Sequence, residues 1–481
     1  MGFDLQREKT NATSQQASER VPTAKRIAYA APAFALAVVG IPVYVYLPKF
    51  YTDAVGVHIT VLGYLILLAR IFDAVIDPGM GLLSDMTRTA FGRRRPYIGG
   101  GAVLLAASLC FLFIPPEASP LVETIWFGIG IFTLFLFWTA VTVPYEALGP
   151  EITMDYDERT SLLGMRDGFL IAGTLVAASS PALVVLLFDL ASDAEGERAK
   201  FFWIAMVYSP LLVALCWWCV LAIRERPSAA ARERAPWRGL GDLARNRPFI
   251  ILLVSYVVAA FGSNLPATLI LYYVQYVLGS EQADLFLLIY FVTGILFLPG
   301  WVLLTRRLEK KITWLAAMVI NTGAFIGVFF LGPGDAPIYG VLVVLSGIGF
   351  GATIAIPSAM QADVIDYDEL LSGKRREGLY VGVWSVTKKL AAALGVGAAL
   401  TILGQVGYVP NTDQTEQVQF ALRVLYALVP SLCNVAAFFI AIFYPITRGV
   451  HREILAAIAE RRAGRTVRDP LRPGRRWSGS G

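Results

Sequence analysis

Residues 59–84 read ITVLGYLILLARIFDAVIDPGMGLLS, an apolar stretch that is interrupted by three charged side chains. A helix that crosses a bilayer needs about 20 mostly apolar residues, so this stretch is long enough to span. Arg70, Asp73 and Asp77 are spaced by three and four residues, which places them on one face of a helix. A charge at mid-membrane costs about 2.5–3.5 kcal/mol on insertion scales and almost always faces a protein interior or an aqueous cavity. The stretch therefore predicts a membrane helix with a polar, functional face.

The rest of the chain repeats this apolar pattern. It has 481 residues, of which 56% are apolar and 16% are charged, whereas soluble domains carry about 45–50% and about 25%. We expect an all-α integral membrane protein with twelve transmembrane helices, and the composition excludes a disordered chain, a disulfide scaffold and a DNA-binding module. The expected spans are about 27–50, 59–84, 97–114, 122–148, 163–188 and 201–223, then about 249–278, 283–305, 312–331, 338–362, 379–405 and 420–446.

Basic residues predict the orientation of these spans. Lys and Arg lie mainly in the two tails, in the central linker and in the loops after even-numbered spans. Because cytoplasmic loops are enriched in Lys and Arg, we expect both termini in the cytoplasm and the chain in the plasma (inner) membrane. The basic C-terminal tail is expected to be disordered or to lie on the anionic inner leaflet. The expected parts are an N-terminal tail (1–26), a six-helix half (27–223), a linker (224–247), a second six-helix half (248–446) and the C-terminal tail (447–481).

The two halves share a short sequence. Asp-Tyr-Asp-Glu at 155–158 recurs at 366–369, in each case after an apolar segment that contains proline. Two related halves around a midplane site are the architecture of many secondary transporters. The chain has neither a G-x-x-x-x-G-K-[ST] phosphate loop nor a G-x-S-x-G nucleophile motif. We therefore expect a transporter driven by an ion gradient, with no enzymatic activity.

The carboxylates of Asp73 and Asp77 indicate which coupling ions the protein could bind. Two carboxylates one turn apart supply the hard oxygen ligands that Na⁺ needs, and one of them could instead carry a proton. Thr139, in the fourth span, could add a hydroxyl ligand, although a membrane threonine often bonds its own backbone. The alternative for the charged face is a structural Arg–Asp network that holds helices together. We expect Na⁺ or H⁺ as the coupling ion and no other cofactor.

Further polar side chains predict gates or substrate contacts. Glu146 follows Pro144 near the end of the fourth span and is expected either to join a gate ion pair or, with Thr142 of the same span, to contact the substrate. Arg166, at the start of the fifth span, either holds an anionic or hydroxyl-rich substrate or braces loop carboxylates, and both interpretations stay open. The expected gating residues are Arg70, Asp155, Asp157, Arg159, Asp366 and Arg375.

Lys388 and Lys389 lie about ten residues into the eleventh span, too deep to be explained by position at a helix end. One of them is expected to face a cavity and to link ion and substrate binding, and a structural role is the alternative. Tyr44 and Trp384 could line a substrate pocket, although each on its own is more often part of ordinary packing.

These motifs together resemble a known family. The segments Ala69–Pro78 and Gly92–Ile98, the tripeptide Val143-Pro144-Tyr145, and the run from Asp363 to Leu390 closely resemble the glycoside–pentoside–hexuronide:cation symporters, the melibiose-permease group of the major facilitator superfamily. The resemblance covers about 27–446. It implies a twelve-helix fold and sodium- or proton-coupled symport. It also implies that Asp73 and Asp77 are the cation carboxylates, Thr139 a cation-site hydroxyl, Lys389 the lysine that links the two sites and Arg166 the fifth-span arginine.

The sequence departs from this family where the family binds sugar. Ile76 stands where the melibiose permease has Asn, and Ala37 stands where it has a first-span Asp. Thr142 and Glu146 stand where it has a fourth-span Asp and Trp. Sodium-dependent lysophospholipid symporters resemble the chain in the aspartate pair and the lysine, and they also lack the sugar-binding set.

Two substrate classes are therefore expected to compete, a sugar or glycoside and a lysolipid-like amphiphile. Either would be a small-molecule or lipid partner of a monomer surrounded by membrane lipid, with no nucleic acid. A membrane sensor that does not transport is the third alternative, and the intramembrane charges argue against it because they are costly without transport.

Overall fold

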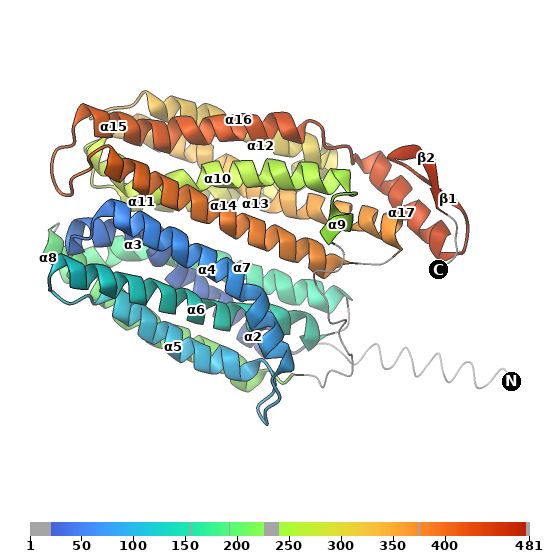
Figure 1. Ribbon diagram of the computed structural model, residues 1–481, viewed down its shortest axis with the longest axis horizontal. Coiled ribbons are helices and arrows are strands. Elements are labelled where there is room, and N and C mark those ends of the chain that lie inside the picture. Colours follow the sequence, from blue (N-terminus) through green and yellow to red (C-terminus); the bar gives the residue numbers. More distant parts are fainter. Residues whose placement is uncertain (1–20, 154–155, 192, 226–239, 374–375, 478–481) are drawn as a thin grey trace. The chain divides into compact units, whose positions relative to one another are not determined.

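The computed structural model describes residues 21–153, 156–191, 193–225, 240–373 and 376–477. Within them, twelve helices are long and apolar enough to cross a membrane, which confirms the expected number of spans. The chain divides into two compact units, residues 1–230 and 231–481, and the division falls within the stretch predicted as the linker. Figure 1 shows that the long helices of each unit run side by side, coloured blue to green in the first unit and yellow-green to red in the second.

The first unit contains six spans. The first span starts as α2 (Thr23–Ile41) and continues through η1 (Pro42–Tyr46), α3 (Leu47–Lys49) and η2 (Phe50–Val55). The other five are α4 (Ile59–Met86), α5 (Arg95–Phe113), α6 (Pro120–Ile152), α7 (Tyr156–Phe188) and α8 (Ala194–Ala222).

The second unit contains the other six spans. They follow the short helix α9 (Leu240–Leu243) and are α10 (Arg247–Tyr276), α11 (Ala283–Arg307), α12 (Lys310–Phe329), α13 (Ala336–Ser372) and α14 (Glu377–Gln405). The last span combines α15 (Glu416–Arg423), η3 (Val424–Leu428) and α16 (Val429–Ala441).

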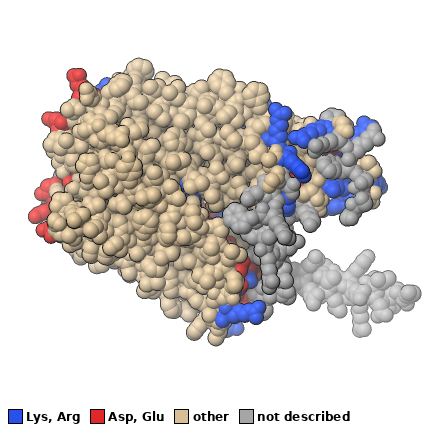
Figure 2. Space-filling view, viewed as in Figure 1, with Lys and Arg blue, Asp and Glu red and all other residues tan. Residues whose placement is uncertain are grey.

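The outer faces of these helices suit a bilayer. Large apolar side chains such as Leu186, Leu221 and Leu296 are at least 70% exposed. Figure 2 shows that uncharged side chains cover most of the visible face, while Lys and Arg gather near α17 (Arg448–Arg462). A helix satisfies its own backbone hydrogen bonds, so it can expose apolar side chains to lipid without exposing unpaired amides.

The first span departs from a regular α-helix at η1 and η2. Pro42 and Pro48 have no backbone N–H, which removes two of the regular i→i−4 hydrogen bonds. The span ends at Gly56, whose φ of 100° lies in the left-handed region that glycine adopts without strain. Wide π-helical turns of this kind often occur at functional sites.

The expected end of the tenth span is wrong, and so is the expectation of a disordered tail. The expected tenth span ended near residue 362, but α13 continues to Ser372, so the copy of the repeat at 366–369 is helical rather than a loop. The C-terminal tail is not disordered, because it forms α17 and the antiparallel strands β1 (Val467–Asp469) and β2 (Arg472–Trp477), and its position on the inner leaflet stays a prediction. Ile454, Ile458 and Val467 of the tail are buried in the core of the second unit, which supplies the apolar contacts that order it.

Candidate functional site

Asp73, Asp77 and Thr139 meet inside the first unit. Helix α4 carries the two carboxylates one turn apart, and α6 carries the hydroxyl. The Oγ1 atom of Thr139 lies 2.7 Å from Oδ1 of Asp73 and 3.0 Å from Oδ1 of Asp77. Asp73 is 2% exposed and Thr139 is fully buried. The structure thus brings together the three residues predicted to bind the cation, and cation binding itself stays a prediction.

The Thr139 hydroxyl has a single proton to donate to the two carboxylates. A hydroxyl carries one proton, so Thr139 can donate to only one carboxylate at a time. The other short oxygen–oxygen contact is repulsive unless a carboxyl group carries a proton or a cation lies between the oxygens. Both arrangements place one positive charge among three oxygen atoms. Pro78, one residue after Asp77, donates no N–H to the carbonyl of Ala74, which therefore lacks its regular helical hydrogen bond.

The oxygen-rich group is distinct from a transition-metal centre. Within the described residues, no three His, Cys, Asp or Glu side chains converge on one point. Carboxylate and hydroxyl oxygens suit hard cations, and two carboxylates with one hydroxyl are a small ligand set. Ile76 lies half-buried beside the pair and contributes no ligand atom.

Arg70 lies one helical turn before Asp73 and contacts aromatic rings. Its Cζ atom is 4.0 Å from the ring centroid of Tyr44 and 4.6 Å from that of Phe135. Trp138 packs edge-on against Tyr44, with 5.7 Å between the ring centroids. The sequence predicted Arg70 as a gating residue and Tyr44 as a substrate contact, and the structure brings the two together.

The other polar side chains predicted in the first unit have local partners. The Thr142 hydroxyl donates to the carbonyl oxygen of Trp138 at 2.9 Å, within its own helix. Arg166 bonds the adjacent carboxylate of Asp167 at 2.7 Å, and the charge of Glu146 also acts on it. Glu146 itself is exposed. The geometry favours neither interpretation of Arg166.

The second unit holds Lys389 and Trp384 on α14. Lys389 is half-buried and Lys388 is exposed. Trp384 is 8% exposed and belongs to the apolar core, with its ring 4.3 Å from that of Tyr256. Trp384 therefore lies in ordinary packing, the alternative weighed for it.

An ion-pair network holds the loop between α4 and α5, at the end of the unit that is predicted to be cytoplasmic. Arg94 is fully buried and bonds Asp85 at 2.8 Å and Glu151 at 2.9 Å. Glu225 accepts hydrogen bonds from the backbone N–H groups of Arg93, Arg94 and Arg95 at 2.8–2.9 Å. The basic loop is evident from the sequence, but its contacts with Asp85, Glu151 and Glu225 were not predicted. A run of unpaired amides at the start of α5 was a signal that an anion was needed there.

A related network holds the same end of the second unit. Lys310, at the start of α12, bonds Asp363 of α13 at 2.7 Å, which parallels Arg94 and Glu151 in the first unit. The predicted gating residue Asp366 lies 3.0 Å from His451 of α17, and Glu369 pairs with Arg462 of the same helix. These tail contacts were missed because the tail was expected to be unstructured.

Three predicted gating residues cannot be placed in these networks. Asp155 and Arg375 lie outside the described residues, as does the side chain of Asp157. Arg159 is half-buried, and its Nη2 donates to the carbonyl oxygen of Thr153 at 3.3 Å.

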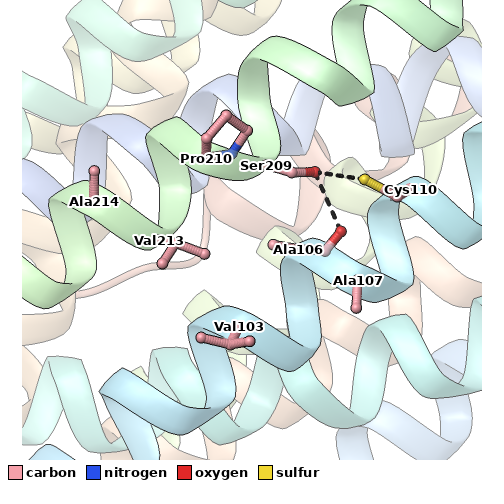
Figure 3. A pocket seen from close by; sticks show the side chains of 8 residues that line it. All are labelled: Val103, Ala106, Ala107, Cys110, Ser209, Pro210, Val213 and Ala214. Atoms are coloured by element: carbon pink, nitrogen blue, oxygen red, sulfur yellow. Dashed lines mark hydrogen bonds between the residues drawn. The ribbon is translucent and has the colours of Figure 1, made fainter.

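A groove of about 400 Å³ lies between α5 and α8, away from the carboxylates. Figure 3 shows that its walls are mainly small apolar side chains, with Ser209 and Cys110 as the polar exceptions. Ser209 donates to the carbonyl oxygen of Ala106 at 3.2 Å and lies 3.1 Å from the Cys110 sulfur. Because these polar atoms already bond within the protein, the groove offers little to orient a sugar.

The chain is similar to known transporters along nearly its whole length. Residues 28–448 match the MFS/sugar transport protein family. A glucuronide carrier protein homolog of Escherichia coli (strain K12) is 28% identical, over 87% of this chain and 91% of the relative. The isoprimeverose transporter of Lactiplantibacillus pentosus is 25% identical, over 92% of each chain. The crystal structure of nucleoside transporter NupG, 14% identical, has a TM-score of 0.63 over 88% of this chain and 100% of that chain, a likeness that shows the fold alone.

Proposed function

Because the chain belongs to the MFS/sugar transport protein family, we propose that Asp73, Asp77 and Thr139 bind the cation with which it carries a sugar-type solute. Membership confirms the resemblance to the cation symporters of the major facilitator superfamily. The chain is a multi-pass membrane protein and a secondary active symporter. We further propose that the protein is a monomer and that both of its termini lie in the cytoplasm. The distribution of Lys and Arg supports this position of the termini.

The placement of the Thr139 hydroxyl carries the cation assignment. One hydroxyl lies 2.7 and 3.0 Å from two carboxylate oxygens, and this cluster of three oxygen atoms suits a proton or a hard cation. Asp73 is almost fully buried, and a buried carboxylate is costly unless it is paired or hydrogen-bonded. Ile76 supplies no ligand atom where the melibiose permease has an amide, which makes H⁺ as plausible an ion as Na⁺.

Charge neutralisation then couples the ion to movement. With no cation bound, the carboxylates resist transfer into a closed, dry interior. A bound cation removes that cost and shifts the equilibrium toward closed states, since a ligand favours the conformation that binds it better. By its likeness to the family lysine, Lys389 links cation binding to solute binding.

A sugar derivative is the solute we favour. The relatives include proteins named for a glucuronide and for isoprimeverose. The first unit offers the indole ring of Trp138 and the guanidinium of Arg166, groups that pack against a sugar ring or bond its oxygens. An amphiphile such as a lysophospholipid is the second candidate, because Ala37 and Thr142 leave the first unit without the carboxylates that hold sugar hydroxyls in the melibiose permease.

Thermal stabilisation of the purified protein tests both parts of this proposal. A ligand that binds only the folded state raises the apparent melting temperature. We expect a cation response, to Na⁺ with choline as the control salt or to acid pH, and a solute response that the cation strengthens. Stabilisation by glycosides and uronides would support a sugar as the solute. Stabilisation by lysophospholipids, without any stabilisation by sugars, would instead identify a lysophospholipid as the solute.

Carboxylate variants test the ion site directly. In Asp73→Asn and Asp77→Asn we expect loss of the cation response and of gradient-driven uptake in proteoliposomes. Each substitution removes one of the two negative charges that attract the cation. Asp413→Asn, at an exposed loop carboxylate, is the matched control and should behave as wild type. Gradient-driven accumulation at the wild-type level in either Asp73→Asn or Asp77→Asn would refute the assignment.

A further inference from the structure

We infer that Tyr44 and Phe135 are positioning residues, which hold the charge of Arg70 away from the carboxylates of Asp73 and Asp77. This inference rests on the proposed cation site. It assigns a role to the aromatic side chains beside that site and changes the role of Arg70 from a gate to a restrained competitor.

The guanidinium of Arg70 is held by rings. Its Cζ atom lies 4.0 Å from the Tyr44 centroid and 4.6 Å from the Phe135 centroid, both well inside the range of a cation–π contact. The two rings are stacked at 22°, with their centroids 6.4 Å apart. The Nε atom of Arg70 is buried and has no hydrogen-bond partner among the described residues. The rings therefore provide much of the stabilisation of this charge.

Without the rings, Arg70 would be a competitor for the cation. It precedes Asp73 by three residues and Asp77 by seven on the same face of α4, and side chains three apart on a helix are neighbours. Arginine stays charged at every physiological pH, so it cannot be neutralised by losing a proton. A guanidinium paired with Asp73 would supply the positive charge that the carboxylates otherwise take from the coupling ion. In this proposal, the rings prevent that pairing by the direction in which they hold the Arg70 side chain.

The same two elements place the rings and the ligands. Tyr44 lies in the π-helical turn η1, whose wider winding follows from the prolines of the first span. Helix α6 supplies Phe135 and the cation-site hydroxyl of Thr139, four residues apart and hence on one face. Trp138 supports Tyr44 from the edge. A shift of α6 that moves the hydroxyl would therefore also move the ring that restrains Arg70.

Four variants test this role through cation affinity, measured as the midpoint of thermal stabilisation in Na⁺ titrations and in pH titrations without substrate. In Tyr44→Leu we expect the midpoint to move about tenfold, toward higher Na⁺ or about one pH unit lower, because the released arginine pairs with Asp73. Tyr44→Phe keeps the ring face and should keep the wild-type midpoint. In the double variant Tyr44→Leu/Arg70→Gln the competitor is gone, so the midpoint should return to that of Arg70→Gln alone.

The double variant separates positioning from packing. If Tyr44 served only to fill space, removal of the Arg70 charge would not restore the midpoint, and a Tyr44→Leu midpoint that stays shifted in the double variant overturns the inference. A Tyr44→Leu midpoint equal to wild type also overturns it. Should Tyr44→Leu fail to fold, Arg70→Gln alone tests the inference. If the rings keep the Arg70 charge away from the carboxylates, Arg70→Gln should bind the cation as tightly as wild type or more tightly. Loss of the cation response in Arg70→Gln would contradict the inference. Absence of any cation response in the wild type would instead refute the proposed cation site itself.

Discussion

Thr139 places one hydroxyl between two carboxylates, so its single proton determines how the pair shares charge. The hydroxyl is fully buried, and α6 holds it at hydrogen-bond distance from both Asp73 and Asp77. A threonine that only bonded its own backbone would leave the carboxylates to find other donors. The observed contacts make Thr139 a part of the carboxylate pair rather than of the helix backbone.

Removal of this hydroxyl should weaken cation binding. Thr139→Val keeps the shape of the side chain and loses the oxygen, and a hydrogen bond to a charged group contributes about 1.5–3 kcal/mol. We expect the cation concentration at half-maximal uptake to rise about tenfold or more, with Thr139→Ser close to wild type because it keeps the oxygen. Equal half-saturation in Thr139→Val and Thr139→Ser would show that the oxygen is not a ligand.

The sequence predicts the carboxylate pair better than it predicts what surrounds it. Asp73 and Asp77 share a face through helix geometry alone, and their cost in a membrane marks them as functional. The contact with Thr139 depends on how α4 and α6 align, which spacing along one helix does not specify. The position of Arg70 was missed because it requires a π-helical turn that puts Tyr44 beside it, and sequence patterns do not identify such turns.

Close approach of α2 and α7 depends on a glycine. A Cβ atom on Gly173 would lie 2.4 Å from the carbonyl oxygen of Phe34 and 2.9 Å from the Cβ of Ala37. Neither atom belongs to the end of a flexible side chain, so the helices would have to separate. Gly164, on the same helix, has no heavy atom within 4 Å of the corresponding position.

Alanine substitution at these two glycines should have opposite effects. We expect Gly173→Ala to lower the free energy of unfolding by about 1–3 kcal/mol through overpacking. Gly164→Ala should be neutral or stabilising by up to about 1 kcal/mol, because alanine favours the helix over glycine. Melting temperatures of the two variants in one detergent make the comparison, and a Gly173→Ala protein as stable as Gly164→Ala would mean that α2 and α7 can separate at little cost.

Hydropathy locates the spans but not the polar ends of the helices. The tenth span was expected at about 338–362, and the structure extends it to Ala336–Ser372. The extra turns carry Asp363, Asp366 and Asp368, which no hydropathy window would include. Lys310, His451 and Arg376 bond these three carboxylates and thereby stabilise the extra turns, and two of the three partners come from other helices.

The C-terminal tail completes the second unit. Ile454 and Ile458 of α17 enter its core, and the buried carboxylate of Asp469 in β1 accepts a hydrogen bond from the hydroxyl of Tyr367 at 3.0 Å. A tail rich in arginine is typical of a disordered or lipid-bound segment, so its composition did not predict the ordered elements that it forms. The tail has few apolar residues, and these alone do not predict that it docks on the carboxylates of α13.

Docking of this tail should depend on pH through His451. The imidazole Nε2 lies 3.0 Å from Asp366 and 3.5 Å from Asp363, with Lys310 as the nearby opposing cation. The hydrogen bond to Asp366 raises the pKa of His451, and burial acts against it. A raised pKa in the docked state means that protonation strengthens docking. The gain is complete below the ordinary histidine pKa of about 6.5 and is lost as the pH rises through the higher, docked value.

Hydrogen exchange of the α17 amides measures this effect. After correction for the intrinsic rate, we expect stronger protection of residues 448–462 at about pH 6 than at about pH 8. His451→Gln keeps a hydrogen-bond donor but cannot be charged, so it should abolish the difference between the two pH values. The α10 amides report the core of the same unit and serve as the internal control. Wild-type protection of α17 that is equal at both pH values, or a pH dependence that survives in His451→Gln, would place the pH sensitivity elsewhere than at this imidazole.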